Sequence, residues 1–207
     1  SRRSCRSYHD RPLARELLED LVRIGTCAPS GTNSQGWTFT ILPHREAVES
    51  LGNLVAAYFA RLNRQAANPL LRNLLRLLGR PALANYYHRY HRTITQALQE
   101  WEQQGCDRLF HGAPAAILVG SRPGASCPKE DALLATQNIL LAAHTLGLGS
   151  CLIGFAVAAM ARTPKIQQAL DIPKEETIHA VIALGYPAEP YQRLTGRKPI
   201  TPRYFSE

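Results

Sequence analysis

The sequence lacks several features that would place it in a specialised class. Its five cysteines never form a C-x-x-C pair, which argues against a zinc ribbon, an iron–sulfur site or a disulfide framework. A reducing cytoplasm is therefore the expected compartment. Charged residues make up only 19% of the chain, and Gly and Pro number 14 each, so neither wholesale disorder nor a low-complexity repeat is expected.

The longest stretch without charge, from Ala132 to Ala161, does not predict a membrane span. Although Asp, Glu, Lys and Arg are absent from it, polar residues at 136–138 interrupt the apolar run and glycines break it midway. We expect a buried helix that leads into a glycine-rich strand or loop, and no membrane partner. The sequence opens with Ser1 rather than Met and shows no signal peptide, so an earlier segment or domain is compatible with it.

Positive charge is in clear excess. The 24 Lys and Arg residues outnumber the 16 Asp and Glu residues, which gives a net charge of +8. An anionic partner or ligand is therefore expected. At 207 residues the chain fits one domain that buries a core without disulfide or metal staples.

The patterning along the chain predicts about four strands and six or seven helices, arranged as an α+β layer fold. The expected strands are 37–42, 115–120, 178–185 and, as a short strand or turn, 150–154. Helices are expected from Pro12 to Gly25, over 129–146, and after Thr163-Pro164, where the threonine is expected to cap a short helix.

A helical excursion is predicted at about 46–111, between the first two strands. A helix restarts within it at Asn68-Pro69. Its aromatic residues and one histidine are candidates for a substrate wall, although residues at helical spacing are more often core; they are Tyr86, Tyr87, His88, Tyr90 and Trp101. Five further histidines are expected to be structural: His9, His44, His111, His144 and His179.

Two basic clusters at opposite ends of the sequence are candidates for binding an anion. The first is Arg2-Arg3-Ser4-Cys5-Arg6, and the second contains Arg193, Gly196, Arg197 and Lys198. Guanidinium groups bind phosphate in a planar, bidentate manner, and a neighbouring hydroxyl adds a donor. The two clusters could clamp one phosphate if the fold brings the ends together; each could instead be a solvated chain end.

The glycine-bearing segment 147–154 offers a further candidate. Glycines let the backbone approach a flat ligand closely, although a helix C-cap followed by a tight turn explains the pattern equally well. The segment lacks the third glycine and the preceding strand of a dinucleotide-binding fingerprint, so a Rossmann fold is not expected.

Five segments, in order and with matching spacing, carry a resemblance to a known family. They are Arg2-Arg3-Ser4-Cys5-Arg6, Ala28-Pro29-Ser30 with Asn33, Gln35 and Trp37, the glycine segment 147–154, Leu184-Gly185-Tyr186-Pro187-Ala188-Glu189, and Gly196-Arg197-Lys198-Pro199. Together they extend the match from Arg2 to Pro199, and only Glu46 to His111 lies outside the resemblance. In these segments the sequence resembles the FMN-dependent nitroreductases.

The resemblance implies a single nitroreductase-like flavin-binding domain over 1–207, in which helices flank a central, mostly antiparallel sheet. It also implies an intertwined homodimer with FMN at the subunit interface. The uncharged segment from Ala132 to Ala161 would belong to that interface. The implied cofactor-binding residues are Arg2, Arg3, Ser4, Arg6, Leu152, Ile153, Gly154, Arg197 and Lys198, with Pro29, Ser30, Gly31 and Asn33 from the other subunit. Arg6 would lie near N1 and the C2 carbonyl of the flavin, where a cation stabilises the reduced ring.

The activity implied by the resemblance is transfer of two electrons from NADH or NADPH, through FMN, to a nitroaromatic or quinone acceptor in a ping-pong sequence. No metal and no catalytic side chain is expected, because the cofactor carries the chemistry. Alternatives are a relative with other flavin chemistry (dehalogenation, ene reduction or flavin breakdown), a non-enzymatic flavin-binding protein, and a ferredoxin-like electron donor in place of the nicotinamide. Nucleic-acid binding, which predicts a basic stripe with interleaved aromatics, is not expected, since the basic residues fall instead at the two flavin-phosphate positions and along the helices from Arg61 to Arg92.

Overall fold

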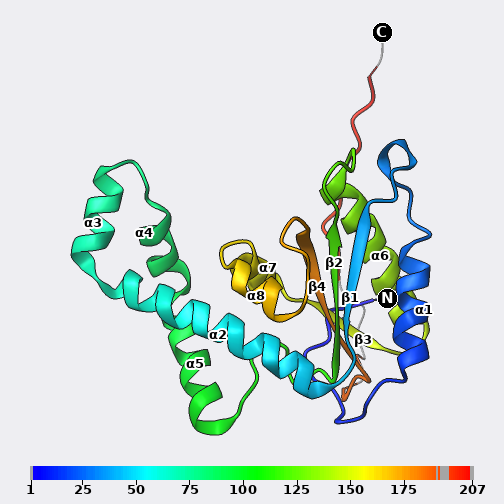
Figure 1. Cartoon of the computed structure of the whole chain (residues 1–207), viewed down its shortest axis with the longest axis horizontal. Coiled ribbons are helices and arrows are strands. Elements are labelled where there is room, and N and C mark those ends of the chain that lie inside the picture. Colours follow the sequence, from blue (N-terminus) through cyan, green and yellow to red (C-terminus); the bar gives the residue numbers. More distant parts are fainter. Residues whose placement is uncertain (1, 190, 192–195, 206–207) are drawn as a thin grey trace.

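An antiparallel sheet forms the centre of the computed structural model, which describes residues 2–189, 191 and 196–205. Within these residues the sheet has four strands in the order β1-β2-β4-β3, where β1 is Trp37–Leu42, β2 is Ala115–Ser121, β3 is Gly149–Leu152 and β4 is Thr177–Gly185. All three pairings are antiparallel. The four predicted strands and the α+β class are therefore confirmed (Figure 1).

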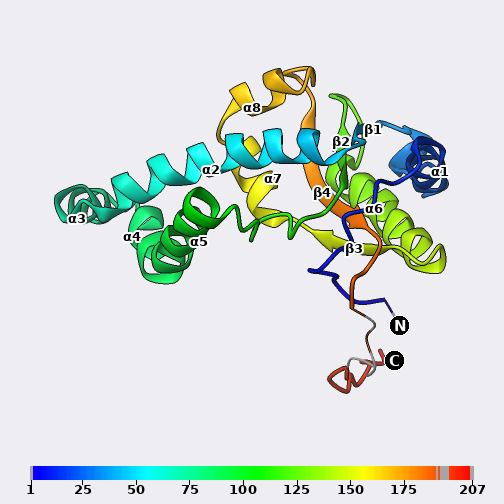
Figure 2. The ribbon, with the colours of Figure 1, turned by 90° about the horizontal axis from the view of Figure 1, so that it is seen from below.

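Helices cover both faces of the sheet. On one face lie α1 (Arg15–Gly25) and α6 (Pro128–Thr145); on the other lie α2 (Arg45–Ala67), α7 (Gly154–Met160) and α8 (Pro164–Ala169) (Figures 1 and 2). Successive side chains of a strand point to opposite faces. Accordingly, Ile117 of β2 packs in the core under α1 and α6, whereas Leu118 packs in the core under α2. Because both faces of β2 are covered, its seven residues are all buried and read as one apolar run.

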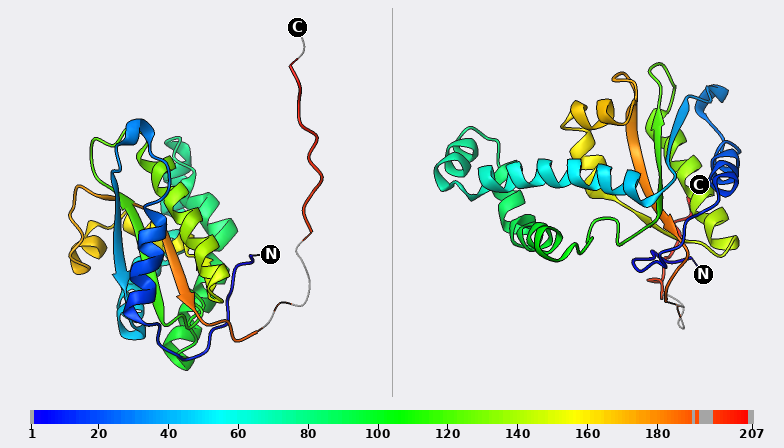
Figure 3. Two further views of the ribbon diagram at one scale, coloured as in Figure 1. Left: turned by 90° about the vertical axis from the view of Figure 1, so that its right-hand side faces the viewer. Right: turned by 60° about the horizontal axis from the view of Figure 1, so that its bottom comes forward.

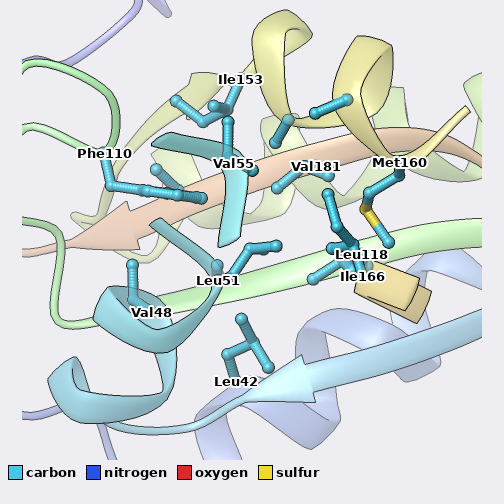
Figure 4. Close-up of a cluster of buried hydrophobic side chains, with 14 of the residues drawn as sticks. Leu42, Val48, Leu51, Val55, Phe110, Leu118, Ile153, Met160, Ile166 and Val181 are labelled. Atoms are coloured by element: carbon cyan, nitrogen blue, oxygen red, sulfur yellow. The ribbon is translucent and has the colours of Figure 1, made fainter. Parts of the chain in front are cut away.

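The core on the α2 face joins the sheet to the excursion. Val48, Leu51 and Val55 recur along one side of α2 and pack on β2 and β4 together with Ile166 of α8 (Figure 4). Beyond this core the excursion continues through α3 (Pro69–Leu77), α4 (Ala82–Tyr86), a π-helical turn (Tyr87–His91) and α5 (Arg92–Gln104). The Asn68 side chain accepts hydrogen bonds from the backbone N–H groups of residues 70 and 71, which explains the predicted helix restart.

Three local predictions need correction. Helix α1 begins at Arg15, so Pro12 precedes the helix instead of lying in its first turn. Thr163 occupies the N-cap position of α8 without a side-chain capping bond, and its hydroxyl is buried without a partner. Helix α7 was not expected, because its uncharged sequence after Gly154 reads as the end of a strand or turn.

The described C-terminal residues leave the body of the molecule. Residues 196–205 are exposed and extend away from the sheet (Figure 3). In the described part of the chain, no helix has the length and apolar character needed to cross a membrane.

Candidate functional site

The N-terminal segment is held against the end of the sheet. Ser4 bridges to Ser150 of β3, and the Cys5 N–H donates to the Ser150 carbonyl over 2.9 Å. A few residues later, the His9 N–H donates to the Tyr186 carbonyl over 2.9 Å. Residues 4–9 are therefore tied to the ends of β3 and β4, which holds Arg6 and the neighbouring arginines at 2 and 3 near β3.

Two glycines make this placement possible. Gly149 and Gly185 are opposite each other in the β3–β4 pairing. A Cβ on Gly149 would lie 2.6 Å from the Cys5 Sγ, and a Cβ on Gly185 would lie 2.6 Å from the Pro114 Cδ and 2.8 Å from the Tyr8 ring. Any side chain at either position would push the N-terminal segment away from the strands.

A cavity of about 920 Å³ opens beside this segment. On the sheet side it is lined by Arg6 and by the end of β3 and start of α7, namely Leu152, Ile153 and Gly154. The excursion supplies an aromatic wall opposite, made of Tyr58, Phe59, Tyr86 and Tyr90. Its volume lies within the range of small-molecule sites. Four of the cofactor-binding residues implied by the resemblance thus lie around one cavity.

The cavity is strongly cationic. Arg6, Arg80, Arg108 and Arg162 line it together with His111, and no Asp or Glu belongs to the described lining. Arg108 is paired with Glu100 at 3.2 Å. Within the described residues, no ion pair neutralises Arg6, Arg80 or Arg162. Such a site favours an anionic, planar ligand.

His111 adds an imidazole to this lining. Burial lowers its pKa; Asp107 opposes that effect, and the positive charges of Arg6 and Arg108 add to it. Because the ring is held toward its neutral form, it can both donate and accept a hydrogen bond in the cavity. The sequence predicted only a structural role for His111 and did not predict that it lines the cavity.

A buried polar cluster fixes the aromatic wall. The Tyr86 hydroxyl donates to the Asn63 Oδ1, and the Asn63 Nδ2 donates to the Thr95 Oγ1 over 3.0 Å. Burial raises the pKa of Tyr86 to about 12, so the hydroxyl keeps its proton for this bond. Phe155 of α7 contacts the wall edge-on, with its ring centroid 5.8 Å from that of Tyr90.

The proposed substrate wall is therefore present in part. Tyr86 and Tyr90 line the cavity, whereas the Tyr87 ring lies 3.8 Å beneath the Arg72 guanidinium. The indole N–H of Trp101 donates to the Asn53 Oδ1, and Trp101 lines a second cavity of about 600 Å³. His88 belongs to neither described lining.

The loop that carries Pro29, Ser30, Gly31 and Asn33 lies at the other end of the sheet. Trp37, which follows it, pairs with Ser121, and Ser121 pairs with Thr177; Ser4 and β3 instead meet the Gly185 end of β4. The loop is ordered by its own contacts, since the residue-31 N–H donates to the Asp131 Oδ1 over 2.9 Å. One chain alone does not bring this loop to the cavity.

The two chain ends meet at Tyr191. Its hydroxyl donates to the Ser4 carbonyl over 2.8 Å, and the Arg3 guanidinium lies 4.4 Å from its ring centroid. Arg197 and Lys198 lie further along the exposed tail (Figure 3). Arg193 falls outside the described residues.

Sequence reasoning missed Arg80, Arg108, Arg162 and Phe155. Arg80 and Arg108 come from the excursion, and Phe155 and Arg162 from α7 and the turn after it; they form no motif, and only the folded chain brings them around one cavity. The described part of the chain holds no cluster of three His, Cys, Asp or Glu side chains suited to a metal ion. All five cysteines are free thiols, two of them buried.

The fold and this cavity define the class. The chain adopts the α+β fold of solved nitroreductases. Two of these structures match it over almost its whole length. Against an FMN-dependent nitroreductase from Clostridium difficile R20291 the TM-score is 0.68 at 20% identity, covering 99% of this chain and 95% of the other. Against a nitroreductase with bound FMN from Desulfitobacterium hafniense DCB-2 it is 0.62 at 25% identity, covering 98% and 90%.

Sequence comparison gives the family. The model of the nitroreductase family matches residues 1–186, and the chain belongs to that family. It is also similar to a protein named NADH dehydrogenase from Thermus thermophilus, with 29% identity over 91% of this chain and 84% of that protein. A 4-nitrobenzoate reductase from Nocardioides is 26% identical over 89% of this chain and 77% of its own length.

Proposed function

We propose that the protein is an FMN-dependent oxidoreductase that passes two electrons from NADH or NADPH to an electron-poor acceptor, a nitroaromatic or a quinone. The observation that carries the proposal is the cavity at the end of β3, which combines Arg6 with an aromatic wall and contains no carboxylate in its described lining. Membership of the nitroreductase family and likeness to FMN-carrying structures support it.

The residues present fit FMN. A Cβ built on Gly154 meets nothing within 4 Å, so the backbone there is open to a flat ring. The arginines around the site match a phosphate and the electron-rich edge of a flavin.

Each implied residue then has a role. Arg2, Arg3 and Ser4 would bind the phosphate and ribityl chain, and Arg6 would lie beside the ring. The backbone of Leu152, Ile153 and Gly154 would contact the ring from the strand side. The remaining positions would complete the site between two subunits: Pro29, Ser30, Gly31 and Asn33 from the partner loop, with Arg197 and Lys198 closing on the phosphate.

The chemistry follows from these positions. Bound FMN supplies a two-electron carrier that accepts hydride from a nicotinamide and delivers it to the acceptor. Arg6 stabilises the negative charge that develops on reduction, and the aromatic wall, with Phe155 packed against it, keeps water from the reacting face. Because one cavity serves donor and acceptor in turn, we expect ping-pong kinetics.

A second copy of the chain is the expected partner. Leu133, Leu134 and Leu141 are large, exposed apolar side chains on the outward face of α6, where burial against another subunit would remove them from water. The same association would bring the partner's 29–33 loop to a cavity that the chain's own loop does not reach. A cytoplasmic setting, with NADH or NADPH at hand, suits this activity.

Absorption spectroscopy tests the proposal. Purified protein supplied with FMN should retain a flavin absorption band at about 450 nm, and the band should bleach on mixing with NADH or NADPH. An Arg6→Gln variant should be reduced about a hundredfold more slowly, with Arg6→Lys between the two. If the protein does not retain flavin, the proposal is contradicted. If the flavin is retained but is bleached only by a ferredoxin-type donor, the nicotinamide is not the electron donor.

A further inference from the structure

Helix α3 carries an exposed leucine stripe at the tip of the excursion. Leu70, Leu74, Leu77 and Leu78 are 79%, 55%, 85% and 63% exposed. Their spacing of four, three and one places them along one side of the helix. Leu71 and Leu75, on the adjoining side, are half-buried. The exposed stripe therefore continues the apolar face of α3 outward into solvent.

The leucine stripe lies in the most cationic part of the chain. Residues 50–99 contain no Asp or Glu and no Lys, but seven arginines, which account for a charge of +7 in a chain of net +8. They are Arg61, Arg64, Arg72, Arg76, Arg80, Arg89 and Arg92. All but Arg72 are exposed. A partner for this surface must be anionic and must also accept leucine side chains.

The position of the stripe suits an extended, flat partner. Helix α3 lies at the far end of the molecule from α1, and the two views agree on this (Figures 1 and 2). Arg72 fastens α3 to the rest of the excursion, since its guanidinium lies 3.8 Å from the Tyr87 ring centroid and bonds to the Ala66 carbonyl. The stripe therefore lies at one end of the molecule, where a flat surface can meet it without first meeting the sheet domain.

We propose that the leucine stripe of α3 docks on an anionic lipid bilayer, with the surrounding arginines held at the headgroups. Apolar side chains buried at the headgroup boundary and basic residues attracted to anionic lipid are the two contributions to interfacial binding by an amphipathic helix. A bilayer fits better than an acidic protein, because its headgroups attract arginine and its acyl boundary accepts leucine without a pocket shaped for either. Such docking requires no membrane-spanning helix.

Docking would also bring the cavity to the lipid. Leu75 of α3 and Arg80, just beyond it, both line the 920 Å³ cavity. With the tip on a bilayer, a lipid-dissolved quinone could reach the cavity without crossing bulk water. This consequence rests on the proposed function and selects a membrane quinone as the acceptor.

Vesicle sedimentation tests the docking itself. The full chain, with FMN supplied, should sediment with vesicles containing phosphatidylglycerol and much less with vesicles of phosphatidylcholine alone. A Leu74→Gln/Leu77→Gln variant should bind about tenfold more weakly, whereas the matched Leu74→Met/Leu77→Met variant should bind as the wild type does. Arg64→Gln/Arg76→Gln should lose about fivefold per arginine at low salt.

The outcomes separate the surface from the reaction. Failure to bind anionic vesicles, or equal binding by the glutamine variant, overturns the proposal. If the glutamine variant instead changes the oligomeric state on gel filtration and the wild type binds no vesicles, the stripe is a subunit contact. If the wild type binds vesicles but turns over a vesicle-dissolved long-chain quinone no faster than a water-soluble one, only the membrane-quinone acceptor is overturned. If the wild type binds vesicles but its flavin is not reduced by NADH or NADPH, only the proposed function is overturned.

Discussion

At the scale of single residues, the site depends on two glycines, whose lack of a side chain leaves room for the N-terminal segment. Gly149 and Gly185 leave the space into which Cys5, Tyr8 and Pro114 pack. Burial raises the pKa of both Cys5 and Cys151, so these thiols act as packing groups beside the cavity and not as nucleophiles. The position of Arg6 is thus set by the strand ends beneath it.

A Gly185→Ala substitution should destabilise the protein by about 1–3 kcal/mol, because its methyl group would overlap the Pro114 ring, which cannot rotate away. Thermal or urea unfolding measures the change. Gly52→Ala is the matched control, since a Cβ there meets the Phe110 ring at 3.8 Å, an ordinary contact. Equal stability of the two variants would show that the strand ends tolerate a side chain.

The pH dependence of stability should include a contribution from His111. Burial lowers its pKa in the folded state below the value in the unfolded chain, so protonation favours unfolding. Stability should therefore fall as the pH drops from 7 toward 5. His111→Asn should reduce that fall, since asparagine tolerates the left-handed backbone at this position (φ 60°). Urea unfolding at pH 7.5 and 5.5 would show it; an unchanged difference contradicts this role.

At the scale of elements, the excursion combines a firm base with a lightly held tip. Its base is pinned where Arg45 pairs with Asp107 at 2.8 Å and where Asn63 is bonded between α4 and α5. At the tip, by contrast, none of the residues of α3 is buried. The tip should therefore open locally without unfolding the sheet.

Asn68→Ala should weaken α3 by about 1 kcal/mol, because two backbone N–H groups lose the side chain that caps them. Hydrogen exchange over 69–78 should speed up while the global melting temperature hardly moves. Asn68→Asp keeps a capping oxygen and serves as the control. A large fall in global stability would mean that the tip and the sheet unfold together.

The sequence predicted regular elements well and their assembly less well. Apolar runs such as 115–120 report burial directly, and Asn68-Pro69 is a local helix signal. Helix α7 was missed because its seven uncharged residues are too few to show a period. Arg108 was missed because its place beside Arg6 depends on how the excursion folds back, and Arg162 because it follows the unpredicted helix α7; no local pattern encodes either position.

At the scale of the whole molecule, the proposed site residues lie at two opposite ends of the sheet. Arg6 and residues 152–154 surround the cavity, whereas the 29–33 loop lies at the opposite end of the sheet. The exposed leucines of α6 supply a face through which a second chain could bring its loop across.

A Leu134→Glu/Leu141→Glu variant should be monomeric on gel filtration and should lose bound FMN, because charges on this face oppose its burial. Leu134→Met/Leu141→Met keeps volume and apolarity and should remain dimeric with flavin bound. A monomeric wild type that holds FMN would contradict the two-chain site.

The pairing of β1 with β2 has a consequence for how the protein can diversify. Leu42 and Ala116 are direct partners in the sheet, so the entire excursion is a loop whose two ends are already joined by the β ladder. The entropy of closing such a loop grows only with the logarithm of its length, by about 0.6 kcal/mol for each doubling. Beyond the part of α2 that packs on the sheet, the insert can be lengthened, shortened or exchanged at little expense to the fold. Selection can therefore rebuild the surroundings of the acceptor while leaving the strand ends, and the arginines fixed on them, unchanged.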